Sequence, residues 1–318
     1  MADTPKIVVT RRIPEPAVEL LREAGDVWVS PDDRPLETDE LHDAVKGADI
    51  AVTLLHDKVD DAFLDAAGPQ LKVVANVAVG YDNIDVDAVR ARGVLVTNTP
   101  GVLTDATADL AIALMLAVTR RLGEGERLIR SETGWAWAID FMLGTSVQGK
   151  TLGIVGYGAI GRATAARARA FGMEIAYHQR RQAEDADDAR FMALDDLLAT
   201  ADVVSLHCPL TRETRHLIDA DALARMRSSA YLINTARGPI VDEAALAEAL
   251  AAGRIAGAGL DVFEEEPKVH PGLIGLDNAV LVPHLGSATV ETRNAMADLA
   301  VRNVVAVLRG EPPLTPIA

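Results

Sequence analysis

Residues 151–161 read TLGIVGYGAIG, an apolar run followed by a loop with three glycines, and this stretch decides the fold. The run Thr151–Val155 predicts a buried strand, and residues 159–171 predict a helix. A G-x-G-x-x-G loop between a strand and a helix is typical of dinucleotide binding, because glycines permit a tight turn and close approach of the backbone to a pyrophosphate. The candidate cofactor residues of this loop are Gly156, Gly158, Ala159, Ile160 and Gly161.

Short β-branched runs alternate with helix-like segments on both sides of this loop. This alternation predicts an α/β fold of two Rossmann-like or flavodoxin-like domains with parallel sheets, and an active site in the cleft between them. The predicted strands lie near residues 7–9, 27–29, 50–55, 73–75, 94–97, 151–155, 174–178, 203–206, 231–234, 255–261 and 280–282.

Two longer helices organise the predicted domains. One begins at Thr104 or Asp105 and runs toward Arg130, and the other is amphipathic and covers 289–309. Because the first series of strands lacks a final covering helix, the last helix is expected to return to it. The substrate-binding domain is therefore predicted to be discontinuous, with residues 1–99 plus 287–318. Residues 100–286, including the linking helix, form the predicted dinucleotide-binding domain.

Composition narrows the class of protein. The 318 residues carry a formal net charge of −16, which argues against a nucleic acid or an anionic membrane as partner. The only cysteine, Cys208, excludes an intramolecular disulfide framework and fits a cytoplasmic location. The longest apolar run, residues 110–118, is far shorter than the roughly 20 residues of a membrane helix. The first residues do not read as a signal peptide, and no metal is expected.

The strand predicted at residues 174–178 is the first one after the glycine loop, and its end indicates which nicotinamide cofactor binds. An NAD site usually places Asp or Glu about 20 residues after the loop, whereas the 2′-phosphate of NADPH needs a cation. Residues 177–181 read YHQRR, and the first carboxylate is Glu184. Arg180 and Arg181 therefore favour NADPH, without excluding NADH. The alternative interpretation is that both arginines are solvated turn residues.

Arg237, Glu266 and His284 each follow a strand-like run. The carboxyl ends of strands in open α/β sheets are where ligands bind. A guanidinium can hold a carboxylate through two parallel hydrogen bonds, and an imidazolium can protonate a ketone oxygen as hydride arrives. A nearby carboxylate would keep that imidazole protonated. The trio therefore predicts hydride transfer to a small keto acid, although each residue alone is more often a surface arginine, a solvated acid or a core histidine.

Four motifs in order resemble the D-isomer-specific 2-hydroxyacid dehydrogenases. They are the glycine loop, Asn-x-x-Arg-Gly at 234–238, Asp-Val-Phe-Glu-x-Glu-Pro at 261–267 and Pro-His-x-Gly at 283–286. The resemblance implies that Arg237 binds the substrate, that His284 is the general acid and base, and that Glu266 orients it. It also implies cofactor contacts from Cys208, Pro209, Thr235, Ala236 and Asp261, and substrate contacts from Leu55, Val79, Gly80 and Ser287.

Within that family the chain is most similar to glyoxylate and hydroxypyruvate reductases, as residues 77–82 (VAVGYD) and 284–289 (HLGSAT) indicate. The resemblance implies a homodimer that reduces glyoxylate and hydroxypyruvate to glycolate and D-glycerate with NADPH. Trp135 or Trp137 would reach the partner's site, or both would be interface or core residues. Alternatives are a phosphoglycerate dehydrogenase, an enzyme for a bulkier 2-keto acid, and a non-enzymatic NAD(P)-sensing scaffold similar to corepressors. Formate dehydrogenases pair their histidine with glutamine, so Glu266 argues against that class.

Overall fold

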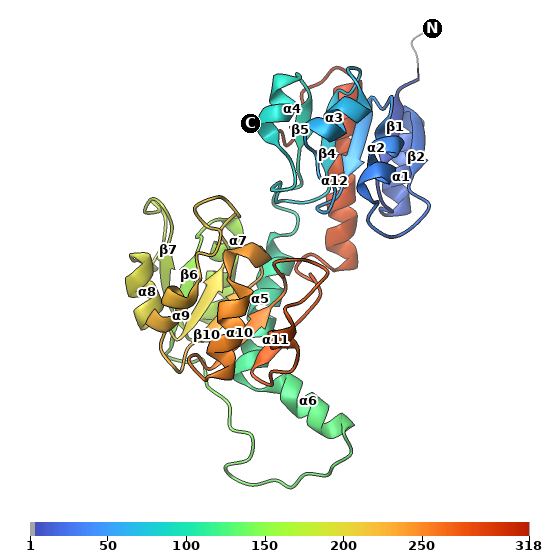
Figure 1. Ribbon diagram of the computed structural model, residues 1–318. Coiled ribbons are helices and arrows are strands. Elements are labelled where there is room, and N and C mark those ends of the chain that lie inside the picture. Colours follow the sequence, from blue (N-terminus) through green and yellow to red (C-terminus); the bar gives the residue numbers. More distant parts are fainter. Residues whose placement is uncertain (1–3, 318) are drawn as a thin grey trace. The chain divides into compact units, whose positions relative to one another are not determined.

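The computed structural model describes residues 4–317, which form two compact units (Figure 1). The first unit contains the residues up to Leu103 and those from Thr289 onward, and the second is Thr104–Ala288. Each unit is an α/β layer structure around one sheet, and every strand pair in both sheets is parallel. The predicted fold class, two α/β domains with parallel sheets, is confirmed.

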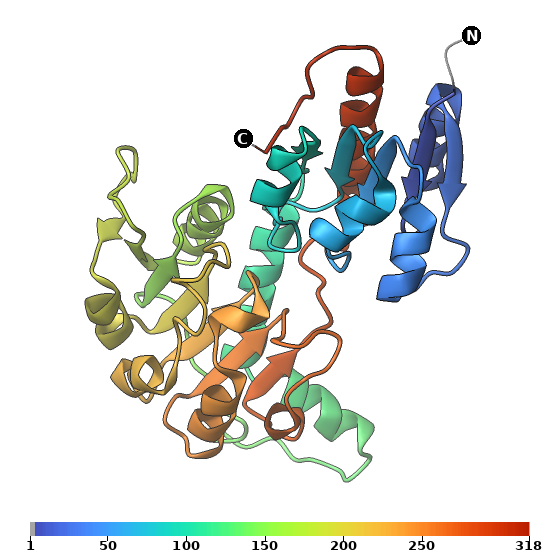
Figure 2. The same ribbon diagram turned by 45° about the horizontal axis from the view of Figure 1, so that its top comes forward.

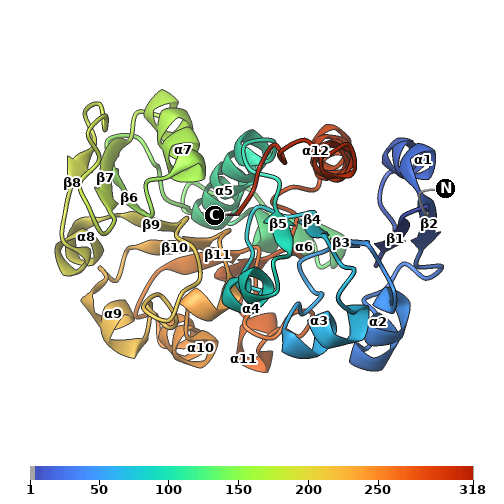
Figure 3. The same cartoon turned by 90° about the horizontal axis from the view of Figure 1, so that it is seen from above.

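The first unit has a five-stranded sheet in the order β2-β1-β3-β4-β5. Helices α1 and α12 cover one face, and α2, α3 and α4 cover the other (Figure 3). The last helix, α12, packs on α1 and β4 although it lies more than 200 residues later in the chain than either. The elements are β1 (Lys6–Val9), α1 (Glu15–Ala24), β2 (Asp26–Val29), α2 (Thr38–Val45), β3 (Ile50–Thr53), α3 (Asp61–Ala67), β4 (Val73–Asn76), α4 (Val86–Ala91), β5 (Leu95–Thr97) and α12 (Val290–Leu308).

The second unit has a seven-stranded sheet in the order β12-β11-β10-β9-β6-β7-β8. Strand β6 lies between β7 and β9, so the chain moves outward from β6 in both directions. The elements are α5 (Thr104–Thr119), α6 (Leu122–Arg130), β6 (Thr151–Val155), α7 (Ala159–Ala170), β7 (Glu174–His178), β8 (Arg190–Phe191), α8 (Leu194–Thr200), β9 (Val203–Leu206), α9 (Ala220–Arg225), β10 (Tyr231–Asn234), η1 (Gly238–Ile240), α10 (Glu243–Ala251), β11 (Gly257–Leu260), α11 (Pro271–Ile274) and β12 (Ala279–Leu281).

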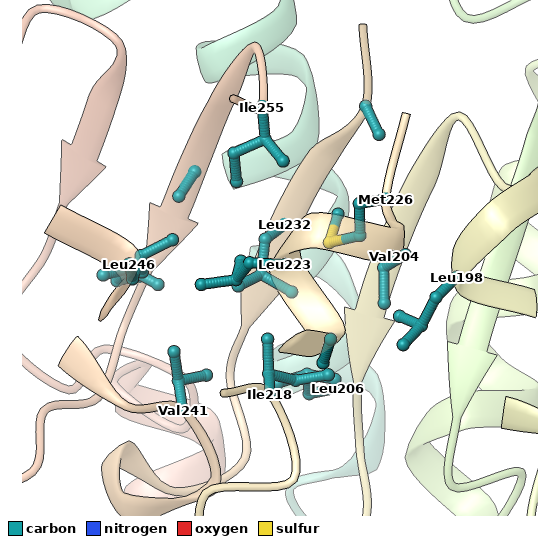
Figure 4. Close-up of a cluster of buried hydrophobic side chains, with 14 of the residues drawn as sticks. Leu198, Val204, Leu206, Ile218, Leu223, Met226, Leu232, Val241, Leu246 and Ile255 are labelled. Carbon is teal, nitrogen blue, oxygen red and sulfur yellow. The ribbon is translucent and has the colours of Figure 1, made fainter. Parts of the chain in front are cut away.

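Two apolar clusters stabilise the second unit, one on each face of its sheet. On one face, side chains of β9 and β10 pack against α8, α9 and α10, including Leu206, Leu232 and Leu246 (Figure 4). On the other face α5 and α7 pack against the strands. Because both faces are covered, the central strands β6, β9, β10 and β11 are mostly apolar and buried, as parallel strands in such sheets usually are. Among residues 4–317, no helix is both long and apolar enough to cross a membrane.

The predicted single helix from Thr104 to Arg130 is wrong, because the structure breaks it into α5 and α6. The break falls at Arg121, whose φ of 55° is left-handed, a conformation that costs a non-glycine residue about 1 kcal/mol or more. Its guanidinium is held by Glu124, with contacts of 2.8 and 2.7 Å to the two carboxylate oxygens. This two-pronged contact between the Arg121 guanidinium and the Glu124 carboxylate, on the first turn of α6, favours the break between the two helices.

Candidate active site

The glycine loop joins β6 to α7 with almost no room for side chains. Gly156 has a φ of 96°, and a Cβ there would lie 2.5 Å from the backbone nitrogen of Cys208. A Cβ on Gly161 would lie 2.3 Å from the Gly156 carbonyl oxygen, whereas one on Gly158 would meet nothing within 4 Å. Gly158 caps α7 without a side-chain hydrogen bond. The loop therefore presents backbone and the amino end of α7 on its open side, which suits a phosphate group.

The carboxyl ends of β9 and β10 lie beside this loop and carry two polar atoms without partners. The register pairs Asn234 with Leu206, so the next residues, Thr235 and His207, are neighbours. Within the described residues, Thr235 Oγ1 and His207 Nδ1 are buried and accept or donate no hydrogen bond. Burial lowers the pKa of His207 to about 4, so its ring is neutral near pH 7. Buried polar atoms are normally satisfied, so these two fit contact with a bound cofactor.

Cys208 follows His207, and its thiol is partly buried. Burial raises the pKa of Cys208 to about 11, so the thiol stays protonated near neutrality. It can line a cofactor site but is a poor nucleophile there. Pro209, which follows, is exposed.

Arg180 and Arg181 lie directly after β7 and are both exposed. The pKa of Glu213 is lowered by hydrogen bonds from its own backbone amide and from Thr211, and further by the charge of Arg180. Arg180 is thus near enough to Glu213, in the loop that follows β9, for the two charges to interact. The end of β7 carries cations at the position where NAD enzymes usually hold a carboxylate.

Arg237 is held in a turn that the Asn234 side chain clamps. Asn234 Oδ1 accepts from the Ala236 backbone N–H (3.0 Å), and its Nδ2 donates to the Arg237 carbonyl (2.9 Å). The Arg237 guanidinium donates to the Ala236 carbonyl through Nη1 at 2.8 Å. A Cβ on Gly238 would lie 1.9 Å from the Phe263 carbonyl carbon, so only glycine allows this turn to press on the segment that carries Glu266.

Glu266 and His284 meet although 18 residues separate them in the chain. His284 Nδ1 lies 2.8 Å from Glu266 Oε2, and both side chains are largely buried. The other oxygen, Oε1, accepts from the Phe263 backbone N–H at 3.0 Å. A carboxylate on Nδ1 fixes the tautomer of the ring and leaves Nε2 as the atom that can exchange a proton with a ligand.

Asp261 holds the turn that carries His284. Its two carboxylate oxygens accept from the backbone N–H groups of Leu285 (2.5 Å) and Gly286 (2.9 Å), and its carbonyl accepts from His284 N (2.8 Å). Burial raises the pKa of Asp261, and these hydrogen bonds oppose that rise. The φ of His284 is 53°, a left-handed conformation that this clamp supports. Ser287 follows directly, half-buried.

Residues 112–286 match the family model described as "D-isomer specific 2-hydroxyacid dehydrogenase, NAD binding domain", which spans more than half of the chain. The chain belongs to this dehydrogenase family. Its relatives include a glyoxylate reductase of Thermococcus kodakarensis, 49% identical over 98% of this chain and 95% of the relative. The expectation of an NAD(P)-dependent D-2-hydroxyacid dehydrogenase is thereby confirmed.

Solved structures agree with this assignment. A protein of Thermus thermophilus superposes on the dehydrogenase with a TM-score of 0.93 at 46% identity, covering 98% of this chain and 100% of that one. An NADPH-dependent glyoxylate/hydroxypyruvate reductase of Sinorhizobium meliloti, in complex with NADP and malonate, gives a TM-score of 0.87 at 37% identity, covering 99% of this chain and 97% of that one.

The remaining predicted substrate residues of the dehydrogenase lie in its first unit. Leu55 follows β3, and Val79 and Gly80 follow β4, all half-buried. Two asparagine side chains fix the second loop: Asn98 Nδ2 donates to the Val79 carbonyl (2.8 Å) and Asn76 Nδ2 to the Gly80 carbonyl (3.0 Å). The structure thus fixes the conformation of this loop, and its contact with substrate stays a prediction.

Trp135 and Trp137 lie in the loop that follows α6. This loop and α6 project from the body of the second unit (Figure 2). Trp135 stacks on Phe141 with ring centroids 6.1 Å apart, whereas Trp137 and Ile139 are 74% and 81% exposed. We name α6 and residues 131–143 the apolar arm of the dehydrogenase. The tryptophans are not core residues of a single chain.

Sequence reasoning missed His207 as a candidate site residue. It lies between the strand β9 and Cys208, which was chosen because of the family resemblance. The position of His207 could have identified it. It comes directly after a buried strand, at the same edge of the sheet as Thr235.

Proposed function

We propose that this dehydrogenase reduces glyoxylate and hydroxypyruvate to glycolate and D-glycerate, with NADPH as the preferred cofactor. The observation that carries the proposal is the His284–Glu266 contact of 2.8 Å at the carboxyl end of the second sheet. This pair supplies the proton that reduction of a 2-keto acid requires. The relative of Thermococcus kodakarensis, a glyoxylate reductase at 49% identity, supports the substrate class.

The trio of Arg237, Glu266 and His284 takes three different parts in the proposed reaction. Arg237 binds the substrate carboxylate with its guanidinium and so orients the keto group. His284 donates the Nε2 proton to the carbonyl oxygen, where negative charge develops. Glu266 accepts from Nδ1 throughout, which keeps the ring oriented with Nε2 as the donor to the substrate. In the reverse direction, Nε2 accepts the hydroxyl proton.

The bound nicotinamide cofactor supplies the hydride. Its proposed contacts are the glycine loop with Ala159 and Ile160, and Cys208, Pro209, Thr235, Ala236 and Asp261 along the sheet edge. The unpartnered Thr235 Oγ1 supports this set, and His207 Nδ1 extends it. We assign dinucleotide binding to residues 100–286, and substrate binding to residues 1–99 plus 287–318. Leu55, Val79, Gly80 and Ser287 are the further proposed substrate contacts.

A steady-state comparison of 2-keto acids tests the function. We expect kcat/KM for glyoxylate and hydroxypyruvate to exceed that for pyruvate and phenylpyruvate by about tenfold or more, since a pocket of this kind discriminates by size at that level. The measurement is NADPH oxidation followed at 340 nm, roughly the absorbance maximum of reduced nicotinamide. Preference for phenylpyruvate would indicate an enzyme for bulkier acids, and negligible turnover with all four would support the scaffold interpretation.

Arg180→Asp tests the cofactor assignment. Arg180 is exposed directly after β7, and a hydrogen bond from its guanidinium to a 2′-phosphate would contribute about 1.5–3 kcal/mol. We expect KM for NADPH to rise by about ten- to hundredfold, while KM for NADH stays near its wild-type value. Arg254→Asp, an exposed arginine after α10, is the matched control. Equal changes for both cofactors would contradict the assignment.

We propose that the apolar arm joins two copies of the chain in a homodimer. Trp137 and Ile139 expose large apolar surfaces, and soluble proteins usually cover such patches. One of the two tryptophans, Trp135 or Trp137, would then reach the partner's site. Sedimentation equilibrium would contradict the dimer if it gave the mass of one chain.

The low cysteine content supports a cytoplasmic location.

A further inference from the structure

Glu243 is a buried carboxylate that the proposed reaction does not use. It is the first residue of α10 and is only 4% exposed, although an acidic residue at a helix start usually faces solvent. Its Oε1 accepts from the Glu264 backbone N–H, and its Oε2 accepts from the His270 backbone N–H at 3.1 Å. Burial raises the pKa of Glu243, and the two hydrogen bonds lower it. One carboxylate therefore ties down two points of the segment 264–270.

Glu264 completes a reciprocal arrangement with Glu243. Its Oε2 accepts from the Glu243 backbone N–H at 3.2 Å, and its Oε1 lies 2.5 Å from His216 Nε2. Arg215 lies 3.9 Å from the same Oε1. The positive charge of Arg215 offsets part of the repulsion between two neighbouring carboxylates. We name the side chains of Glu243 and Glu264 the carboxylate brace.

Glu266 lies between the two backbone groups that Glu243 holds. One side of the segment is fixed at Glu264, the other at His270, and Glu266 Oε1 is bound to the adjacent Phe263 N–H. Gly238 packs closely against the Phe263 carbonyl, where a Cβ would lie 1.9 Å away. The remaining oxygen of Glu266 is therefore held where it meets His284 Nδ1.

We propose that Glu243 and Glu264 are positioning residues, which hold Glu266 in place for its contact with His284. The inference rests on the role proposed above for Glu266. The hydrogen bonds and ion pairs of the brace among the described residues join it to His216, Arg215 and His270, none of which belongs to the glycine loop or to the end of β7. We therefore expect it to act on proton transfer and not on cofactor binding. Outer contacts of this kind orient the groups that meet the ligand, and a misplacement of about 1 Å can cost two orders of magnitude in rate.

Glu243→Gln tests the brace with little change in volume. The amide keeps one acceptor oxygen but cannot accept from both Glu264 N and His270 N. We expect kcat for glyoxylate reduction to fall about ten- to hundredfold, with the Kd of NADPH unchanged. Glu248→Gln, exposed on the same helix, is the matched control and is expected to keep wild-type kcat. A purely structural role would lower the melting temperature without changing kcat, and that outcome would overturn the proposal.

A double-mutant cycle with Glu266→Gln separates this proposal from the proposed function. If the brace acts through Glu266, the double variant should lose no more activity than Glu266→Gln alone, whereas additive losses would overturn the brace. Wild-type turnover of Glu266→Gln would instead overturn the role of Glu266, and the brace with it. Should Glu243→Gln fail to fold, Glu264→Gln replaces it in the cycle, because Glu264 is half-buried, with a side chain 22% exposed, whereas Glu243 is buried. The same non-additive loss is expected.

Discussion

His284→Asn is expected to lower kcat for glyoxylate reduction by about 10²- to 10⁴-fold, the range that general acid catalysis contributes. Asparagine is the suitable replacement because His284 has a φ of 53°, and asparagine tolerates this left-handed conformation better than most residues. It fills part of the space of the imidazole but cannot donate a proton as an acid. The backbone contacts of the turn with Asp261 should survive, so the variant tests chemistry and not folding.

The measurement combines steady-state kinetics with the affinity for NADPH, followed by its fluorescence. We expect that affinity to remain at the wild-type value, because His284 lies outside the glycine loop. His42→Gln, on α2 of the first unit, controls for the loss of a histidine elsewhere. Near wild-type turnover of His284→Asn would show that another group supplies the proton.

Arg237→Ala is expected to lower kcat/KM for glyoxylate by about 10²- to 10³-fold. Removing one partner of a buried, charge-assisted pair costs about 2–5 kcal/mol, and about 1.4 kcal/mol corresponds to tenfold. Arg237→Lys should recover little of this loss, since an ammonium group cannot form two parallel hydrogen bonds to a carboxylate. The loss should appear mainly as a raised KM for the keto acid.

Arg254→Ala, an exposed arginine of the same unit, is the control for the removal of positive charge. The proposed anchoring role would be untenable if Arg237→Ala kept its KM for glyoxylate. Full recovery in Arg237→Lys would instead indicate that charge alone attracts the substrate and that the planar fork is not needed.

Most of the strands could be predicted from the sequence because they are buried on both faces. Such strands are short, mainly apolar runs that contain β-branched residues, as in Ile50–Thr53 and Val203–Leu206. Strand β8, Arg190–Phe191, was missed for the opposite reason. It is two exposed residues at a sheet edge, where no burial pattern distinguishes a strand from a loop.

The break between α5 and α6 was not predicted, because no glycine or proline stands at Arg121 itself, and Gly123 and Gly125 lie inside α6. It depends on the contact between Arg121 and Glu124, which forms only once the chain has turned. The carboxylate brace escaped notice for a similar reason. Glu243 looks like an ordinary acid at a helix start, and Glu264 belongs to an acidic run. Only their reciprocal backbone contacts distinguish them from solvated residues.

The site residues were easier to predict than the contacts that hold them in place. Arg237, Glu266 and His284 could be chosen because each follows a buried strand of one parallel sheet, and neighbouring strands end at the same edge. The 2.8 Å contact between Glu266 and His284 needs more than strand order. It depends on the left-handed turn at His284 and on the Asp261 clamp, and neither leaves a pattern in the sequence.

The packing of α12 on α1 and β4 sets the order in which the two units can be completed during synthesis. The first sheet leaves the ribosome before any of the second, yet the face that α1 covers only in part stays incomplete until residues 290–308 have been made. The second unit is continuous in sequence and needs nothing from either side. Loss of the last helix would therefore expose apolar surface on the sheet of the first unit, which is synthesised first. The second unit would keep a complete core.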